Sequence, residues 1–321
     1  MKKVVTRWKS IVLKVLIKIR NLDSYLLASQ VTETIFHLIL AMFRRVALVL
    51  AICATSAGAV AQSAAIGSRE DAVPLQPVLV ATVQGQLLKV ATARPDVVVP
   101  VFWMPKDKAI ATVMLMPGGG GGFGRIVDGK PTSGNFLVRS REYFAAQGFN
   151  VAVVGRASDQ EDLDYGYRIS GEHMSDLKKV VEALKRESTA PVWMVGTSRG
   201  TVSTTAAAVA FGNEQLAGIV LTSSVTNQKK QGAVPSQKLG NIRIPVLVMH
   251  HASDACPVCR PYEARNIIGG LNNSPFKKLI METGGGNPTG NPCAGQHYHG
   301  FIGMEKEAVD DIATWIKNPK N

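Results

Sequence analysis

Apolar stretches recur along the chain from about residue 77, and several are continuous runs of Val, Ile, Leu and Met. Runs of this kind are typical of parallel strands that are buried on both faces of a sheet. They predict eight strands, over Pro77–Val83, Val97–Trp103, Ala111–Met116, Phe149–Val154, Val192–Val195, Ala217–Leu221, Val246–Met249 and Lys278–Met281.

Segments with a helical period lie between these strands. Apolar residues at i, i+3, i+4 and i+7 form one helix face. Two sets have this spacing: Leu177, Val180, Val181 and Leu184, and Val309, Ile312, Ala313 and Ile316. Strands that alternate with helices predict an α/β sheet with right-handed crossovers. In such sheets the functional groups lie at the carboxyl ends of the strands.

The charge of the chain is concentrated near its start. The formal net charge is +12, but residues 1–61 hold nine Lys or Arg and two acids, which leaves +5 for residues 62–321. No basic stripe with interleaved aromatic residues follows, so we expect no nucleic-acid partner. A hydrophobic fraction of 46% excludes a disordered chain, and four cysteines in 321 residues exclude a small disulfide-built scaffold. We predict one domain over residues 62–321.

Residues 42–61 have the three parts of a secretory signal peptide. Two arginines follow Met42, an apolar stretch covers Val46–Ile52, and Ala59-Val60-Ala61 ends the segment with small side chains. We predict cleavage near Ala61 and export to a periplasm or the exterior, with residues 1–41 as an upstream extension. The alternative is a membrane anchor that includes the basic amphipathic stretch 8–20. A lipoprotein site at Cys53 is disfavoured because a bulky Ile precedes the cysteine.

A nucleophile motif follows one of the apolar strands. Gly196-Thr-Ser198-Arg-Gly200 stands between the strand Val192–Val195 and a small-residue segment over 201–210. This G-x-S-x-G pattern makes a tight strand-to-helix turn, and its glycines allow the strand and the helix to pack closely. The turn would expose the hydroxyl of Ser198 and direct the amide of Arg199 at a developing oxyanion.

A serine nucleophile needs a base and an acid that orients the base. In this class of fold the acid and then the base follow the serine along the chain. Asp254 follows the strand Val246–Met249, and His299 lies in the loop after the last strand, in the context His-Gly-Phe. We therefore predict Asp254 as the acid and His299 as the base.

Other acids and histidines fit these roles less well. Glu263 and Glu282 lie in a predicted helix and at a strand end. His297 is the alternative base, and otherwise forms the site wall or faces solvent. We interpret His250 and His251 as buried residues near the site and His173 as a surface residue at a helix start.

A glycine run, Gly118–Gly122, follows the strand that ends at Met116. Side chains there would obstruct a substrate carbonyl, so we predict that Gly119 or Gly120 supplies the second oxyanion amide beside Arg199. Gly119, Gly121 and Gly124 also match the G-x-G-x-x-G pattern of dinucleotide sites, with Arg156 as a phosphate partner. Gly129, Pro131 and Gly134 interrupt the helix that such a site requires until about residue 135.

These motifs together resemble the α/β-hydrolase superfamily, and among its members the compact dienelactone-hydrolase-like group. The resemblance covers about residues 77–317. It implies a mostly parallel eight-stranded sheet flanked by helices, a Ser198–His299–Asp254 triad and no cofactor. Residues 222–244 leave no room for a large cap domain. Dienelactone hydrolases proper use a cysteine nucleophile, so their substrate is not carried over.

Three cysteines remain after the signal segment. If Asp254 and His299 meet, Cys256 and Cys293 come close together, and an oxidising compartment would join them in a disulfide. Cys259 is then either free and buried or the true partner of Cys293. Two alternatives are a thioredoxin-type redox pair in Cys256-Pro-Val-Cys259 and a zinc site made by three cysteines and one histidine, Cys256, Cys259, Cys293 and His297.

The sequence therefore predicts an exported serine hydrolase of carboxylic esters or related acyl bonds, acting on a small acyl substrate. A peptidase or amidase with the same triad is one alternative, and a catalytically silent binding protein with the same fold is another. The segment Ser158–Tyr167, with Arg168 nearby, is our hypothesis for the lining of the cleft.

Overall fold

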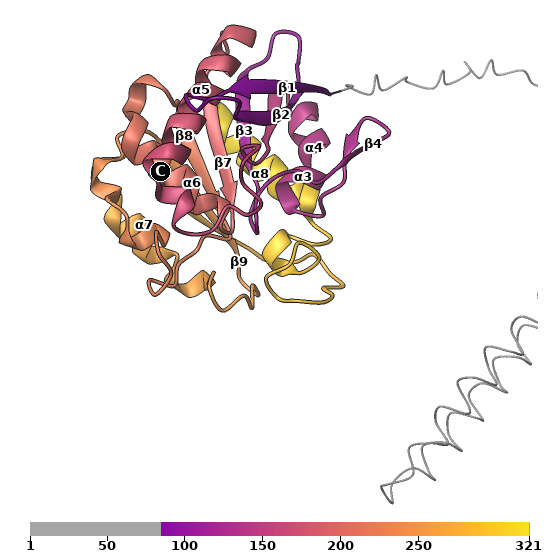
Figure 1. Ribbon diagram of the computed structural model, residues 1–321. Coiled ribbons are helices and arrows are strands. Elements are labelled where there is room, and N and C mark those ends of the chain that lie inside the picture. The colour runs from indigo at the N-terminus through magenta and orange to yellow at the C-terminus, as the bar shows by residue number, and fades with distance from the viewer. Residues whose placement is uncertain (1–84, 321) are drawn as a thin grey trace, which may run out of the picture. The chain divides into compact units, whose positions relative to one another are not determined.

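The structure is a computed structural model, and it describes residues 85–320. Eight strands form one sheet in the order β1-β2-β6-β3-β7-β8-β9-β10 (Figure 1). β2 is antiparallel to both β1 and β6, and all other neighbours are parallel. The strands are β1 (Gln86–Ala91), β2 (Val98–Met104), β3 (Ala111–Met116), β6 (Phe149–Val154), β7 (Val192–Thr197), β8 (Gly218–Thr222), β9 (Val246–His251) and β10 (Lys277–Glu282). A separate hairpin joins β4 (Ile126–Val127) to β5 (Lys130–Pro131).

Helices cover both faces of the sheet (Figure 1). One face carries α5 (Gly171–Glu187), α6 (Gly200–Phe211) and α7 (Arg265–Gly270). The other carries α3 (Phe136–Arg139), α4 (Arg141–Ala146) and α8 (Glu305–Lys317).

Side-chain alternation along the strands divides the core into two layers. On β9, Val246 and Val248 pack in the cluster that contains residues of α5–α7, whereas Leu247 and Met249 pack in the cluster with residues of α8. Successive side chains of a strand point to opposite faces, so a strand covered on both sides must be apolar throughout. The continuous apolar runs seen in the sequence have this origin.

Seven of the eight strands expected from the sequence are present, with ends that differ by a few residues. The eighth expectation, Pro77–Val83, lies outside the described residues, as do the predicted signal peptide and the extension before it. The edge strand β1 was missed. Its sequence mixes Gln, Leu and Lys, and most of its side chains are exposed, so it lacks the signature of a buried strand.

The connection from β8 to β9 is short and contains two 3-10 helices, Val234–Ser236 and Leu239–Asn241. No large cap domain is inserted there, as expected. None of the helices within residues 85–320 has the length and apolar character needed to cross a membrane. The parallel strands β3, β7, β8, β9 and β10 direct their carboxyl ends to the same edge of the sheet, and the loops that follow them build the site.

Candidate active site

Ser198 occupies a sharp turn between β7 and α6. Its backbone φ is +53°, a left-handed value that a residue with a side chain rarely adopts. The turn is held by hydrogen bonds from the Ser198 amide to the Thr222 carbonyl at 3.0 Å and from the Thr201 hydroxyl to the Ser198 carbonyl at 2.6 Å. The strained serine of the predicted elbow is therefore present, and its side chain is half-buried.

The flanking glycines are required by close contacts. A Cβ on Gly196 would lie 2.4 Å from the Thr204 hydroxyl, and one on Gly200 would lie 2.0 Å from the Met116 carbonyl oxygen. A Cβ on Gly118 would lie 2.7 Å from the Cβ of Ser198. Glycines at 196 and 200 let helix α6 approach the sheet, and Gly118 lets the glycine run approach the serine.

Asp254 and His299 meet in a buried hydrogen bond. His299 Nδ1 lies 2.8 Å from Asp254 Oδ2, and the two side chains are 4% and 0% exposed. The second carboxylate oxygen of Asp254 accepts the Cys256 amide at 2.9 Å. Because the carboxylate accepts a hydrogen bond from Nδ1–H, the neutral imidazole carries its proton on Nδ1 and presents an unprotonated Nε2.

The loop that carries His299 is anchored from several sides. A Cβ on Gly300 would lie 2.2 Å from the Gly295 carbonyl oxygen, so only glycine fits. The fully buried ring of Phe301 packs against Phe136 with centroids 4.8 Å apart. Arg139 donates to the Gly300 carbonyl at 2.5 Å, and Ser223 donates to the His299 carbonyl at 2.8 Å. These contacts fix the position of the imidazole.

The Ser198 and His299 side chains do not hydrogen-bond to each other in this structure. Nε2 of His299 is buried and has no hydrogen-bond partner among the residues that the structure describes. The Ser198 hydroxyl has its polar contact with the Cys259 thiol, at 4.0 Å. Hydrogen bonds between a nucleophile and its base are often long without substrate and tighten when substrate binds.

The remaining histidines occupy different environments. His250 is buried, accepts the Ser224 amide at 2.9 Å, and has its pKa lowered to about 4 by burial. His251 is buried and stacks on Tyr298, and His297 is half-buried beside the same tyrosine. The prediction that His173 is a surface residue is wrong. It is 4% exposed, and burial lowers its pKa to about 3.

His173 belongs to a buried polar network for which the sequence carries no signal. Its Nε2 lies 3.0 Å from the Ser203 hydroxyl on α6, which also accepts from Arg168 Nη1 at 3.0 Å. Arg168, which we expected close to the lining segment Ser158–Tyr167, is fully buried. Burial lowers the pKa of Arg168 to about 9, which leaves the guanidinium charged at neutral pH.

The Arg168 guanidinium fixes the glycine run through hydrogen bonds to backbone carbonyls. It donates from Nη2 to the carbonyls of Pro117 at 3.2 Å and Gly119 at 3.1 Å, and from Nε to the Leu163 carbonyl at 2.9 Å. In a trans peptide the C=O and the following N–H point in opposite directions. The amide of Gly120 therefore points away from Arg168. The carbonyl of Gly118, one residue earlier, accepts a hydrogen bond from the Gly121 amide and so closes a turn.

The glycine run does not begin a helix. After Gly124 the chain forms the β4–β5 hairpin, and the next helix, α3, starts at Phe136 with Asn135 as its N-cap. A dinucleotide site of the G-x-G-x-x-G type requires a helix N-terminus at the last glycine. The dinucleotide alternative therefore has no support in the described structure.

The segment Ser158–Tyr167 contacts the residue next to the nucleophile. Asp162 lies 3.4 Å from an Arg199 guanidinium nitrogen, and the ring of Tyr165 lies 5.6 Å from the Arg199 guanidinium carbon. The segment therefore contacts Arg199, the residue that follows the nucleophile, and its role in lining a cleft stays a prediction.

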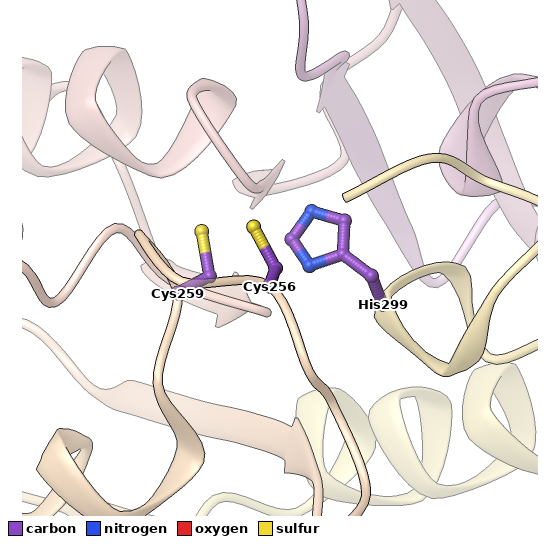
Figure 2. A group of neighbouring side chains, drawn as sticks. All are labelled: Cys256, Cys259 and His299. Atoms are coloured by element: carbon purple, nitrogen blue, oxygen red, sulfur yellow. The ribbon is translucent and has the colours of Figure 1, made fainter. Parts of the chain in front are cut away.

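The cysteines cluster at the same place. Cys256 and Cys293 form a disulfide, and Cys259 is the free and buried cysteine of the described chain. Figure 2 shows the Cys256 and Cys259 side chains projecting in the same direction, with the His299 ring beside Cys256. Burial raises the pKa of the Cys259 thiol, and the Asp254 carboxylate raises it further.

Two cysteine alternatives are not supported. A thioredoxin-type pair requires Cys256 and Cys259 to be joined and one thiol to have a low pKa, whereas Cys256 pairs with Cys293 and the pKa of Cys259 is raised. The zinc set with His297 is also not assembled. The histidine within 4.8 Å of the Cys256 and Cys259 sulfurs is His299.

Comparisons with known proteins identify the fold. No protein-family model matches the chain, and no curated protein matches it. Among solved structures, dienelactone hydrolase from Anabaena variabilis superposes with a TM-score of 0.52 at 16% identity, over 74% of this chain and 100% of that one. The esterase Pf2001 from Pyrococcus furiosus gives 0.53 at 14% identity, over 74% and 93%.

A puromycin-hydrolyzing peptidase from Mycobacterium tuberculosis gives a TM-score of 0.54 at 14% identity, over 77% of this chain and 42% of that one. These identities are low, so the likeness speaks to the fold. The sheet order, the strained serine between β7 and α6, and these neighbours agree with one another. The chain therefore has the α/β-hydrolase fold and resembles the dienelactone-hydrolase-like structures, as its motifs predict.

Proposed function

We propose that the chain is a serine hydrolase that cleaves carboxylic esters or related acyl bonds through an acyl-enzyme. The observation that carries this proposal is the buried Asp254–His299 pair, whose free Nε2 lies at the same sheet edge as the strained Ser198. A serine on such a turn, an imidazole held in the right tautomer and a buried carboxylate are the parts of a nucleophilic triad.

In the proposed reaction Ser198 Oγ attacks the acyl carbon while His299 Nε2 removes the hydroxyl proton. Asp254 holds the imidazole and stabilises the imidazolium that forms. His299 then returns the proton to the leaving alcohol, and the acyl group stays on Ser198. Water, activated by the same nitrogen, releases the acid and restores the serine.

The oxyanion would be held by two backbone amides, one from Arg199 and one from the glycine run. Of the two candidates, Gly119 and Gly120, we favour Gly120. The Gly120 N–H and the Gly119 C=O belong to one peptide group. Because Arg168 donates a hydrogen bond to that C=O, the Gly120 N–H points away from the guanidinium and is free to donate to an oxyanion. Arg168 would then act as a positioning residue.

Labelling with a fluorophosphonate probe tests the nucleophile. The probe should label the wild type and the exposed-serine control Ser236→Ala, but not Ser198→Ala, because only an activated serine reacts. Labelling is measured by in-gel fluorescence on protein whose folding is confirmed by circular dichroism. Absence of labelling of folded wild type would favour the catalytically silent binding protein. Labelled protein that cleaves anilides faster than esters would favour the amidase or peptidase alternative.

Replacement of Arg168 tests the oxyanion arrangement. Arg168→Met should lower kcat by about tenfold to a hundredfold with a smaller change in KM, because loss of an oxyanion donor acts on the transition state. Arg168→Lys should recover part of the loss, and the exposed control Arg186→Met should behave as wild type. Rates are expressed per probe-reactive site, so unfolded protein does not count. An unchanged kcat in Arg168→Met would contradict the positioning role.

We also propose that the chain is exported after cleavage near Ala61. The charged, apolar and small-residue order of residues 42–61 supports this proposal, and so does the Cys256–Cys293 disulfide, since disulfides persist in oxidising compartments. The partners would be small acyl substrates and no nucleic acid. A membrane would be contacted only through the N-terminal segment, if that segment is not removed.

The intact mass of the chain, expressed from its full sequence in a Gram-negative host, tests export. We expect a periplasmic species that starts at Gln62 and is two hydrogens lighter than the fully reduced chain. A membrane-bound species that retains residues 42–61 would support the anchor alternative and contradict cleavage.

A further inference from the structure

Two sulfur atoms beside the catalytic histidine have no part in the proposed reaction. The sulfurs of Cys256 and Cys259 and one ring nitrogen of His299 all lie within 4.8 Å of one another (Figure 2). All three residues are at least nine-tenths buried. The hydrolytic scheme uses His299 but needs neither sulfur, and the buried Cys259 thiol stands 4.0 Å from the Ser198 hydroxyl.

The donor set is suited to zinc. Thiolates and imidazole nitrogens are the ligands of tetrahedral Zn²⁺ sites, and Cys256-Pro-Val-Cys259 has the C-x2-C spacing that such sites use. Mg²⁺ and Ca²⁺ prefer oxygen ligands and would bind poorly here.

The state of His299 matches a metal ligand. Nδ1 is bonded to Asp254 Oδ2 at 2.8 Å, and the buried Nε2 has no hydrogen-bond partner within the described part of the chain. A ligating histidine almost always donates its other nitrogen to a carboxylate or a carbonyl, which orients the ring and raises its basicity. The hydrogen bond to Asp254 therefore leaves the lone pair of Nε2 available to bind a metal as well as to accept a proton.

The disulfide decides whether the ligands are free. While Cys256 is bonded to Cys293, only Cys259 and His299 can bind a metal, and two ligands make a weak site. Cys293 is half-buried, whereas Cys256 is 1% exposed, so a reductant would approach the disulfide from the side of Cys293. A dithiol, or a phosphine together with water, supplies two electrons and two protons. These break the S–S bond and leave a thiol on each cysteine, while the dithiol becomes a disulfide or the phosphine becomes its oxide.

We propose that reduction of the Cys256–Cys293 disulfide creates a zinc site formed by Cys256, Cys259 and His299 at the catalytic centre. Binding of one Zn²⁺ releases two thiol protons and places the metal on Nε2, with water or the freed Cys293 in the fourth position. The zinc-bound enzyme then lacks its base, so zinc inhibits the reduced enzyme and spares the oxidised one. The inhibitory consequence rests on the proposed function, whereas zinc binding does not.

Zinc uptake tests the site directly. Purified wild type, oxidised or reduced with a phosphine, is dialysed against zinc chloride, and bound metal is counted per chain. We expect about one zinc per reduced chain, none per oxidised chain, and no uptake of magnesium by either form. Equal uptake by the oxidised and reduced forms, or no uptake by reduced protein that retains its circular dichroism spectrum, would overturn the proposal.

Two variants distinguish the zinc ligands from the disulfide partner that controls access to them. Cys293→Ser leaves Cys256 and Cys259 free, so it should bind zinc without any reductant. Cys259→Ser keeps the disulfide and, after reduction, should bind zinc more weakly than wild type by more than about 100-fold. Wild-type affinity in reduced Cys259→Ser, or a requirement for reductant in Cys293→Ser, would contradict the assignment.

Ester hydrolysis supplies the second measurement. Zinc should inhibit reduced wild type and untreated Cys293→Ser, each compared with its own zinc-free rate, and should leave oxidised wild type unaffected. Uptake in the expected pattern without any hydrolysis would overturn the proposed function and leave the zinc site standing. Hydrolysis that is insensitive to bound zinc would show that the metal does not occupy Nε2 and would overturn the inhibitory assignment.

Discussion

The hydrogen bond between Asp254 and His299 is the interaction on which the site depends. The two residues come from the loops after β9 and β10, and both side chains are almost completely buried. A buried carboxylate without partners is costly, so these loops have to dock together for either residue to be stable where it lies. The Cys256–Cys293 disulfide and the hydrogen bond from Arg139 to the Gly300 carbonyl join the same two regions to each other and to the core. The packing of these two loops therefore determines the position and orientation of the His299 imidazole.

The parts of the site that could be predicted are those set by local backbone constraints. The strand, tight turn and helix around Ser198 leave a pattern of glycines that can be read directly, and chain order then points to Asp254 and His299. The contacts that Arg168 makes with the glycine run could not be predicted. The partners of Arg168 are the carbonyls of Pro117, Gly119 and Leu163 and the hydroxyl of Ser203, and backbone carbonyls carry no sequence signal. The strand Gln86–Ala91 was missed because an edge strand can be polar, and the burial of His173 depends on packing between distant segments.

His299 connects the proposed catalysis with the proposed zinc site. A neutral imidazole that is protonated at Nδ1 offers one lone pair at Nε2, and that lone pair can accept a proton from Ser198 or bind a metal, but not both. The arrangement that makes a good general base thus also makes a good ligand. The sulfur chemistry beside it determines which use is available, since the disulfide withholds one of the two nearby cysteines.

In the proposed mechanism Ser198 carries the acyl group during turnover. The most direct measurement is peptide mass spectrometry of protein quenched with acid during hydrolysis of a nitrophenyl ester. We expect one acyl group per chain, on Ser198, that forms in wild type and is absent from Ser198→Ala. An acyl group on Cys259, which lies 4.0 Å from the serine, or continued turnover in Ser198→Ala would contradict it.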